Sequence, residues 1–279
     1  MPRVALDPAA PIVVGALGGS GTRVVGQLLI DLGVHMGTHL NSANDSLTAS
    51  LVFNRPGDRA DQTERIARFE RIGRLIRGEA TWSDRLAVIG AVSGISHPPL
   101  RYRLHYALGA LRERGAPAGA TRWGFKEPNT HLFLPALDRA FGAVRYVYVM
   151  RHPLDMAFSA NLQQLANWAP YFDVPVPSDP TQVPAAQLDL WLAATRQALT
   201  LGPELLGDRF LGLDYERLLA EPEAGIDALL GFFGIAVADI APLVDLVRTP
   251  ESTGRFRDED LSQFRTDQLD AVAEAGFRL

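Results

Sequence analysis

Two short apolar runs, each followed by a turn and a helical pattern, organise this chain. The first run, residues 12–17, ends in glycines, and valine and leucine then recur at helical spacing over residues 25–32. The second run, residues 146–150, is rich in β-branched and aromatic residues, and Pro153 after it suits a first helical turn. Apolar strands that alternate with helices predict a central parallel sheet buried on both faces. We therefore expect an α/β protein with three layers.

The region of about residues 45–115 departs from this alternation. Apolar residues at helical spacing predict an amphipathic helix over residues 66–76, and residues 100–114 predict another. We therefore expect a helical insertion in a single domain that spans residues 1–279. Arginines recur at every third position from Arg65 to Arg77, which indicates either a solvated face or a surface for an acidic partner.

Residues 168–184 are dense in proline and aromatic side chains. This composition predicts a loop, and a loop of this length is a candidate lid over a binding site. Residues 189–206 predict a further helix, and residues 122–125 predict a further strand.

The turn after the first apolar run has the composition of an anion-binding loop. It holds three glycines, two hydroxyl side chains and one cation: Gly18, Gly19, Ser20, Gly21, Thr22 and Arg23. Glycine lets the backbone turn tightly and approach a ligand closely. A helix that begins near residues 20–23 directs free N–H groups at this turn. A plain glycine turn that binds nothing is the alternative, since short glycine patterns have many false matches.

This loop differs from two common nucleotide motifs. The phosphate loop of ATP and GTP enzymes ends in Gly-Lys-Ser/Thr, and no lysine lies near Ser20. Asp45 stands at about the distance expected for the acidic residue of a dinucleotide fold, but the glycine pattern does not fit. A nucleotide with another anionic arrangement is indicated.

The second unit offers a separate anion site. Arg151 follows the strand of residues 146–150, at the carboxyl end where open α/β sheets place ligands. Ser159 lies eight positions later, about two helical turns on, so a guanidinium and a hydroxyl can converge on a phosphate. The alternative is that Arg151 only pairs with Asp155.

Composition restricts the function further. The net charge of -5 argues against a protein that binds nucleic acid, and the lack of cysteine excludes disulfides and thiolate catalysis. The N-terminus lacks a signal pattern, and no stretch is long enough for stable membrane insertion. A cytoplasmic protein is expected, and its oligomeric state is left open.

Five segments together resemble the sulfotransferases that use 3′-phosphoadenosine 5′-phosphosulfate (PAPS), in their bacterial and Golgi-like branch. Two are the units above, Gly19-Ser-Gly-Thr-Arg23 and Val147-Tyr-Val-Met-Arg-His-Pro-Leu-Asp-Met-Ala-Phe-Ser159. The others are Trp123-Gly-Phe-Lys-Glu-Pro128, Tyr215-Glu-Arg-Leu with the helical pattern of residues 229–235, and Ser252-Thr-Gly-Arg-Phe-Arg257. They follow the family's order over about residues 11–258, which makes the resemblance specific.

The resemblance implies a P-loop-like fold and in-line transfer of the sulfuryl group of PAPS to a hydroxyl or amine of a small-molecule or glycan acceptor. The positions implied at the 5′-phosphosulfate are Ser20, Gly21 and Thr22. Arg151 and Ser159 would hold the 3′-phosphate, and Tyr215 would contact the adenine. The positions implied to close over the 3′-phosphate are Gly254, Arg255 and Arg257. No metal ion is expected, because side-chain cations can neutralise the sulfuryl group.

One position departs from the family. Where the family has lysine or arginine beside the transferring sulfuryl group, this chain has Gly19. Lys126 is the single lysine among 27 basic residues, and a compact ammonium is not interchangeable with a guanidinium. We expect Lys126 to supply the missing charge, with Arg23 as the alternative.

Two other functions stay open. A kinase that uses ATP is one, although the missing loop lysine counts against it. A catalytically inactive nucleotide-binding module is the other, and Gly19 would explain it.

The general base has three candidates, in the order Asp45, His39 and Glu127. His39 stands four positions after His35 in a stretch similar to one that the family carries near its acceptor site. The two histidines lack a third metal ligand, so a metal site is not expected. The sequence does not identify the acceptor.

Overall fold

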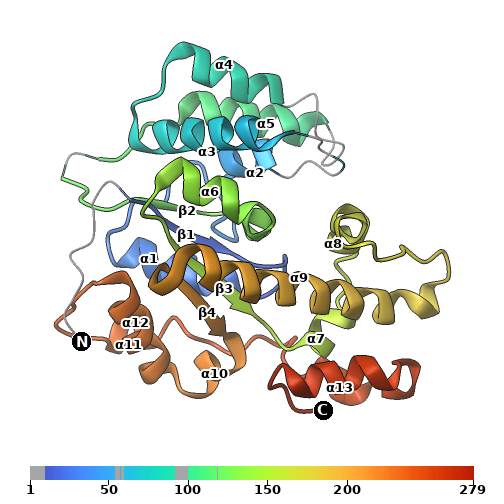
Figure 1. Ribbon diagram of the computed structural model, residues 1–279. Coiled ribbons are helices and arrows are strands. Elements are labelled where there is room, and N and C mark those ends of the chain that lie inside the picture. The colour runs from blue at the N-terminus through green and yellow to red at the C-terminus, as the bar shows by residue number, and fades with distance from the viewer. Residues whose placement is uncertain (1–9, 54–56, 58–59, 92–99, 118) are drawn as a thin grey trace.

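The computed structural model describes residues 10–53, 57, 60–91, 100–117 and 119–279. Its centre is a four-stranded sheet in the order β2-β1-β3-β4 (Figure 1), and every neighbouring pair is parallel. The strands are β1 (Ile12–Gly15), β2 (Gly124–Lys126), β3 (Arg145–Met150) and β4 (Phe210–Asp214). The predicted α/β class with a parallel sheet is therefore confirmed.

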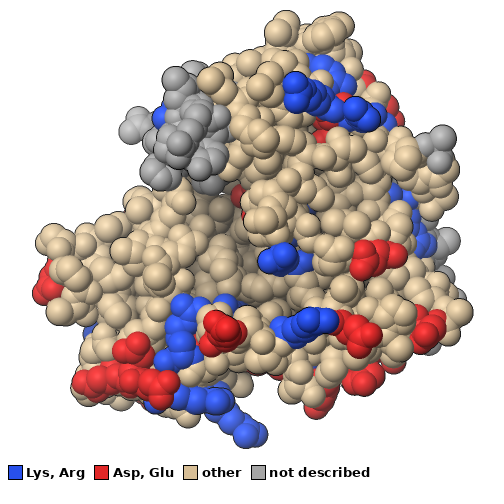
Figure 2. Space-filling view, turned by 180° about the vertical axis from the view of Figure 1, so that it is seen from behind, with Lys and Arg blue, Asp and Glu red and all other residues tan. Residues whose placement is uncertain are grey.

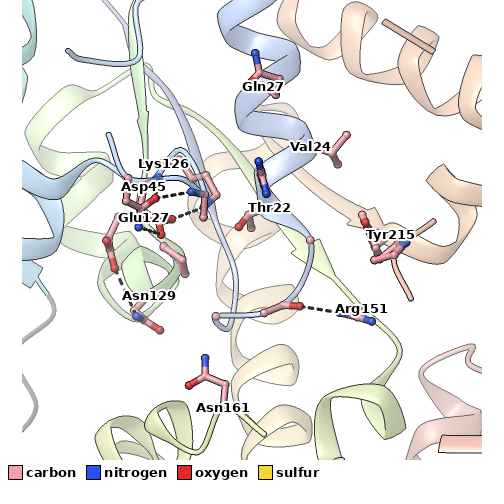
Figure 3. A pocket seen from close by; sticks show the side chains of 18 of the residues that line it. Thr22, Val24, Gln27, Asp45, Lys126, Glu127, Asn129, Arg151, Asn161 and Tyr215 are labelled. Atoms are coloured by element: carbon pink, nitrogen blue, oxygen red, sulfur yellow. Dashed lines mark hydrogen bonds and ion pairs between the residues drawn. The ribbon is translucent and has the colours of Figure 1, made fainter. Parts of the chain in front are cut away.

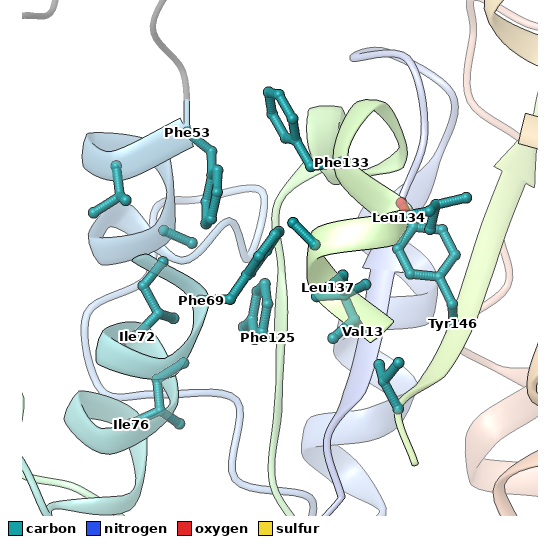
Figure 4. Packing of buried hydrophobic residues seen from close by; sticks show 14 of the residues in the cluster. Val13, Phe53, Phe69, Ile72, Ile76, Phe125, Phe133, Leu134, Leu137 and Tyr146 are labelled. Carbon is teal, nitrogen blue, oxygen red and sulfur yellow. The ribbon is translucent and has the colours of Figure 1, made fainter. Parts of the chain in front are cut away.

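Helices cover one face of the sheet through a large aromatic and aliphatic core. The covering helices are α3 (Gln62–Arg77), α6 (Leu134–Phe141) and α9 (Val183–Leu206). Alternate strand residues point to opposite faces, and Val13 and Tyr146 point to this one. Figure 4 shows Phe53 and Phe69 in the same cluster, with ring centroids 4.0 Å apart. Each large side chain buried here contributes roughly 1.5–3 kcal/mol.

The opposite face packs on α1 (Thr22–Asp31) and α11 (Pro222–Phe233). Val14 and Val147, the neighbours of Val13 and Tyr146, belong to this second cluster. β1 is therefore buried on both sides, which explains its continuous apolar run. Helices on two faces of one sheet confirm the three layers.

In the described residues between α1 and β2, the interval where an insertion is expected, the chain forms four α-helices. They are α2 (Leu47–Phe53), α3, α4 (Trp82–Gly90) and α5 (Leu100–Arg112). Whether the chain forms one domain with this insertion stays a prediction.

The row of arginines on α3 is not a simple solvated face. Arg68 is buried and pairs with Glu64, and Arg74 pairs with Asp84 of α4 at 2.7 Å. Arg65 and Arg77 lie over the rings of Phe133 and Trp123, 5.0 and 4.9 Å from the centroids. Arg74 therefore joins α3 to α4, and Arg65 and Arg77 join α3 to aromatic residues outside the insertion.

Residues 168–184 contain more helix than predicted. α8 (Gln163–Trp168) runs into the short helix η3 (Ala169–Phe172), and η4 (Pro180–Gln182) leads into α9. α9 therefore begins six residues before the predicted position 189. Proline is tolerated in a first helical turn, so Pro184 does not delay its start. Trp168 is fully buried.

Eight further elements complete the described part of the fold. They are η2 (Pro128–Phe133), α7 (Pro153–Ala157), η5 (Gly207–Arg209), α10 (Tyr215–Ala220), α12 (Ala241–Val244), η6 (Arg255–Asp258), η7 (Leu261–Gln263) and α13 (Thr266–Glu274). Within the described ranges, no helix has both the length and the apolar character needed to cross a bilayer.

Candidate active site

The carboxyl ends of three neighbouring strands meet at one edge of the sheet. Val14 of β1 pairs with Lys126 of β2 on one side and with Val147 of β3 on the other. A pocket of roughly 880 Å³ opens at this edge, a size usual for small-molecule sites. Figure 2 shows the hollowed face, with Lys and Arg side chains beside the hollow, and Figure 3 shows the pocket from close by.

The glycine loop turns at this edge between β1 and α1. Gly19 and Gly21 have φ angles of 101° and 83°, a region that favours glycine. Gly21 also lies against the ring of Tyr215, where a Cβ would be 2.5 Å from Cε2. α1 begins at the next residue, Thr22, as predicted. Its free N–H groups therefore lie at the pocket, to which Gly19, Gly21 and Thr22 contribute.

Ser20 shapes the loop rather than facing the pocket. Its side chain is buried, and its hydroxyl donates to the carbonyl of Leu17 at 2.7 Å. The loop is also held from outside, because the N–H of Gly18 donates to Oε1 of Gln164 at 3.1 Å. The implied role of Ser20 at the 5′-phosphosulfate stays a prediction.

Arg151 approaches the loop from the end of β3. Its Nη1 donates to the carbonyl of Gly19 at 3.3 Å, and its Nη2 donates to the carbonyl and hydroxyl of Ser252 at 2.6 and 2.8 Å. Asp155 is more distant, at 3.7 Å, so Arg151 does more than pair with it. Within the described residues, the buried Nε–H of Arg151 has no partner. One strong donor is therefore available to an anion.

A second arginine converges on the same carbonyl. The oxygen of Ser252 also accepts a hydrogen bond from Nε of Arg255 at 3.1 Å. Burial and the nearby charge of Arg151 lower the pKa of Arg255. Two guanidinium groups around one neutral oxygen form a positive site that a bound anion would stabilise.

Asp155 anchors the segment that carries Arg255, which we call the terminal loop (residues 252–257). Its buried carboxylate accepts hydrogen bonds from the N–H of Gly254 at 2.8 Å and from that of Phe256 at 3.4 Å. Gly254 has a φ of 76°, which allows the sharp turn there. The terminal loop is thereby fixed beside Arg151.

Four of the residues implied at the 3′-phosphate lie outside the lining of the pocket: Ser159, Gly254, Arg255 and Arg257. The hydroxyl of Ser159 accepts from the N–H of Asn161 at 3.2 Å and faces a small cavity beside Met156. Arg257 lies 6.0 Å from the ring centroid of Phe256, in a separate groove. Their implied roles at the 3′-phosphate are not tested by this placement.

Lys126 reaches the pocket from the end of β2. It is almost completely buried, and its ammonium forms an ion pair with Asp45, marked by a dashed line in Figure 3. Its stem passes Gly26 of α1, where a Cβ would lie 3.1 Å from Cδ of the lysine. Lys126 and Asp45 both line the pocket, as does the exposed Arg23.

Glu127 lies beside this pair and is also buried. Its carboxylate accepts a hydrogen bond from the hydroxyl of Ser50. Burial and the negative charge of Asp45 raise the pKa of Glu127 to about 7, although Ser50 and Lys126 act in the opposite direction. A carboxyl group that changes protonation near neutral pH therefore lines the pocket.

His39 is not brought to the pocket with these residues. Its ring centroid lies 5.2 Å from that of His105, and a Cβ on Gly109 would lie 1.7 Å from its Nε2. Burial and the neighbouring His105 lower the pKa of His39.

The described part of the chain has no group of three or more histidine, cysteine or acidic residues that could hold a metal ion. Among the described residues, the fold therefore brings no third metal-ligating side chain to His35 and His39. A reaction without metal stays a proposal.

Several residues that line the pocket were missed from the sequence. They are Gln27, Ser50, Asn129, Asn161, Gln163, Gln164, Arg248 and Thr249. Asn129 follows Glu127 closely, so a search of the residues after each strand would have found it. Arg248 belongs to no recognised motif, and only the fold brings it to the pocket.

A glycine loop at a helix start, faced by an arginine from the neighbouring strand of a parallel sheet, is typical of α/β proteins that bind nucleotides. A protein-family model described as "Sulfotransferase family" matches residues 11–239 of the sequence. The chain therefore belongs to the sulfotransferase family, and it is a transferase that uses PAPS and moves its sulfuryl group. The assignment to a bacterial and Golgi-like branch stays a prediction.

Several solved sulfotransferases are similar to this chain in structure. The sulfotransferase domain of the Synechococcus PCC 7002 olefin synthase has a TM-score of 0.53 and 14% identity, over 99% of this chain and 97% of that one. The sulfotransferase domain of the curacin biosynthetic pathway has a TM-score of 0.49 and 11% identity, over 97% of this chain and 99% of that one. Sulfotransferase STF1 of Mycobacterium tuberculosis H37Rv has a TM-score of 0.42 and 18% identity, over 86% of this chain and 71% of that one. The first of these structures, with a TM-score above 0.5, supports the fold. No curated protein matches the chain.

Proposed function

We propose that the pocket binds PAPS between two sets of cations and transfers its sulfuryl group to a hydroxyl or amine acceptor. The observation that carries this proposal is the placement of Lys126 and Arg151. Lys126 ends β2 and Arg151 follows β3, the strands on either side of β1, and both line one pocket to which the glycine loop also contributes. A ligand with two anionic ends matches this arrangement.

The 3′-phosphate binds at Arg151 and Arg255 in this proposal. It is supported by the Nε–H of Arg151, which has no partner among the described residues, and by the two guanidinium groups around Ser252. The 5′-phosphosulfate binds at the start of α1, where free N–H groups and Thr22 favour an anion. Tyr215 lines the same pocket beside Gly21, a position suited to the adenosine.

The reaction is an in-line displacement at sulfur. The acceptor oxygen or nitrogen forms a bond to sulfur while the bond from sulfur to the bridging phosphate oxygen breaks. The leaving nucleotide, adenosine 3′,5′-bisphosphate (PAP), takes the electron pair. Lys126 stabilises the charge that develops on the bridging oxygen, so it replaces the cation that Gly19 lacks.

The acceptor's proton goes to Glu127. A general base works best when its pKa lies near the working pH, and the pKa of Glu127 is about 7. Asp45 is engaged by Lys126, and His39 is absent from the lining of the pocket. This placement favours Glu127 over the order expected from the sequence, which ranked Asp45 first.

Incubation with sulfur-labelled PAPS in EDTA, together with a small-molecule or glycan fraction of a cell extract, tests the proposal. We expect a labelled product and no transfer from γ-labelled ATP. Transfer from ATP would support the kinase instead. PAPS binding without any labelled product would support the inactive module, for which Gly19 is the argument. A cytoplasmic location belongs to the proposal and rests on the sequence.

A further inference from the structure

Part of the pocket wall is rich in carboxamide side chains, one of which, Asn129, lies beside Glu127. Asn129 lies on η2, and Asn161, Gln163 and Gln164 lie at the beginning of α8 or just before it. In Figure 3, Asn129 and Asn161 lie on the same side of the pocket, away from Tyr215. Because a carboxamide both donates and accepts hydrogen bonds, this wall is suited to hydroxyl groups.

Asn129 has a side-chain oxygen with no partner among the residues that the structure describes. Its side chain is 2% exposed, and in the described part of the chain its buried Oδ1 accepts no hydrogen bond. Nearly all buried polar atoms in proteins are paired, so this oxygen indicates a donor on a ligand. Its Nδ2 lies 3.5 Å from Oε1 of Glu127. The amide nitrogen belongs beside this carboxylate, because carboxylate oxygens accept hydrogen bonds, and Oδ1 therefore points elsewhere.

We propose that Asn129 recognises a second hydroxyl on the acceptor, next to the one that takes the sulfuryl group. The reacting hydroxyl donates to Glu127, and its neighbour donates to Oδ1 of Asn129. The two side chains touch each other, so hydroxyls on adjacent carbon atoms match their spacing. This proposal rests on the proposed function, because that function places the reacting hydroxyl at Glu127.

The acceptor is therefore a polyhydroxylated molecule, such as a sugar or a cyclitol. Charge also favours a neutral acceptor. Asp45 and Glu127 line this part of the pocket, and the ammonium of Lys126 is already paired with Asp45. Carboxylated or sulfated acceptors would meet like charge there.

Labelled PAPS with either trans-1,2-cyclohexanediol or cyclohexanol as the acceptor tests this proposal. A site built to bond a hydroxyl rejects the analogue that lacks it, so we expect kcat/KM to be at least about tenfold higher for the diol. Asn129→Leu should bring the ratio of the two kcat/KM values close to one. Asn129→Asp, which keeps an accepting oxygen, should restore much of the preference. PAP binding by each variant shows that its nucleotide site is folded.

Equal use of the two alcohols by the wild type would overturn the proposal and leave sulfuryl transfer intact. A preference that survives Asn129→Leu would overturn it as well. Transfer to neither alcohol counts against it, and labelling of an extract compound then shows whether the proposed function still stands.

Discussion

At the scale of single residues, three charged groups share one buried cluster in the pocket. Lys126 is paired with Asp45, and Glu127 lies beside both. Two carboxyl groups therefore compete for one ammonium, and burial adds to the cost of ionising the second. A phosphosulfate would in turn compete with Asp45 for Lys126.

Removing the ammonium should slow the chemical step. Lys126→Ala should reduce turnover by about 10²–10³, as loss of one transition-state donor does, with little change in PAP affinity. Lys126→Arg should restore only part of the rate, because a planar guanidinium cannot occupy the same point. Steady-state kinetics with labelled PAPS measure both. If Arg23→Ala loses the activity and Lys126→Ala keeps it, the role belongs to Arg23.

Ionisation of Glu127 should set the pH dependence. A base must be deprotonated to act, so kcat/KM should rise with pH and reach half its plateau near the pKa of about 7. Glu127→Gln should lower kcat/KM by about 10²–10⁴ and remove this limb of the profile. A variant that keeps both the rate and the rising limb would show that another group takes the proton.

At the scale of elements, local patterns in the sequence specify the strands and the start of α1, because glycine and apolar spacing act within a few residues. The beginning of α9 and the pairing of the arginines on α3 depend on packing between distant segments. The residues of the pocket divide in the same way between local patterns and contacts of distant segments. Arg151 and the glycine loop were found in the sequence because each follows a strand, whereas the contact of Gln164 with Gly18 joins segments 146 residues apart.

The start of α1 should be sensitive to a side chain at Gly21. Gly21→Ala would add a Cβ 2.5 Å from the ring of Tyr215 at a positive φ. Gly33→Ala is the matched control, because Gly33 has a φ of 78° and nothing within 4 Å of an added Cβ. We expect the control to lose about 1–2 kcal/mol of stability in urea unfolding, and Gly21→Ala to lose more, together with PAP affinity. Equal losses, with normal PAP binding by both, would contradict the role of this contact.

The terminal loop should depend on Asp155. Asp155→Ala leaves the N–H groups of Gly254 and Phe256 without their acceptor, which costs about 1–3 kcal/mol. Titration calorimetry should show weaker PAP binding by a similar amount. The exposed Asp258, which belongs to η6 and follows this loop, provides the control Asp258→Ala. No change from Asp155→Ala, or the same change from both variants, would argue against the anchoring role.

At the scale of the whole molecule, a protein of net charge -5 gathers several cations around one pocket. Arg23, Lys126, Arg151 and Arg248 all line it. Their charge is local, so it selects a small anionic ligand and not an extended polyanion. Side-chain cations in this number can also replace a metal ion at the phosphates, which is why we expect nucleotide binding without magnesium.

The most direct test of the central claim, a pocket built for PAPS, compares PAP with ADP. Isothermal titration of the wild type in EDTA measures both affinities, and only PAP carries a 3′-phosphate for Arg151. We expect PAP to bind at least about tenfold more tightly, and Arg151→Ala to remove about 2–4 kcal/mol of its binding free energy. Equal affinity for PAP and ADP, or a strict requirement for magnesium, would contradict the assignment of this pocket to PAPS.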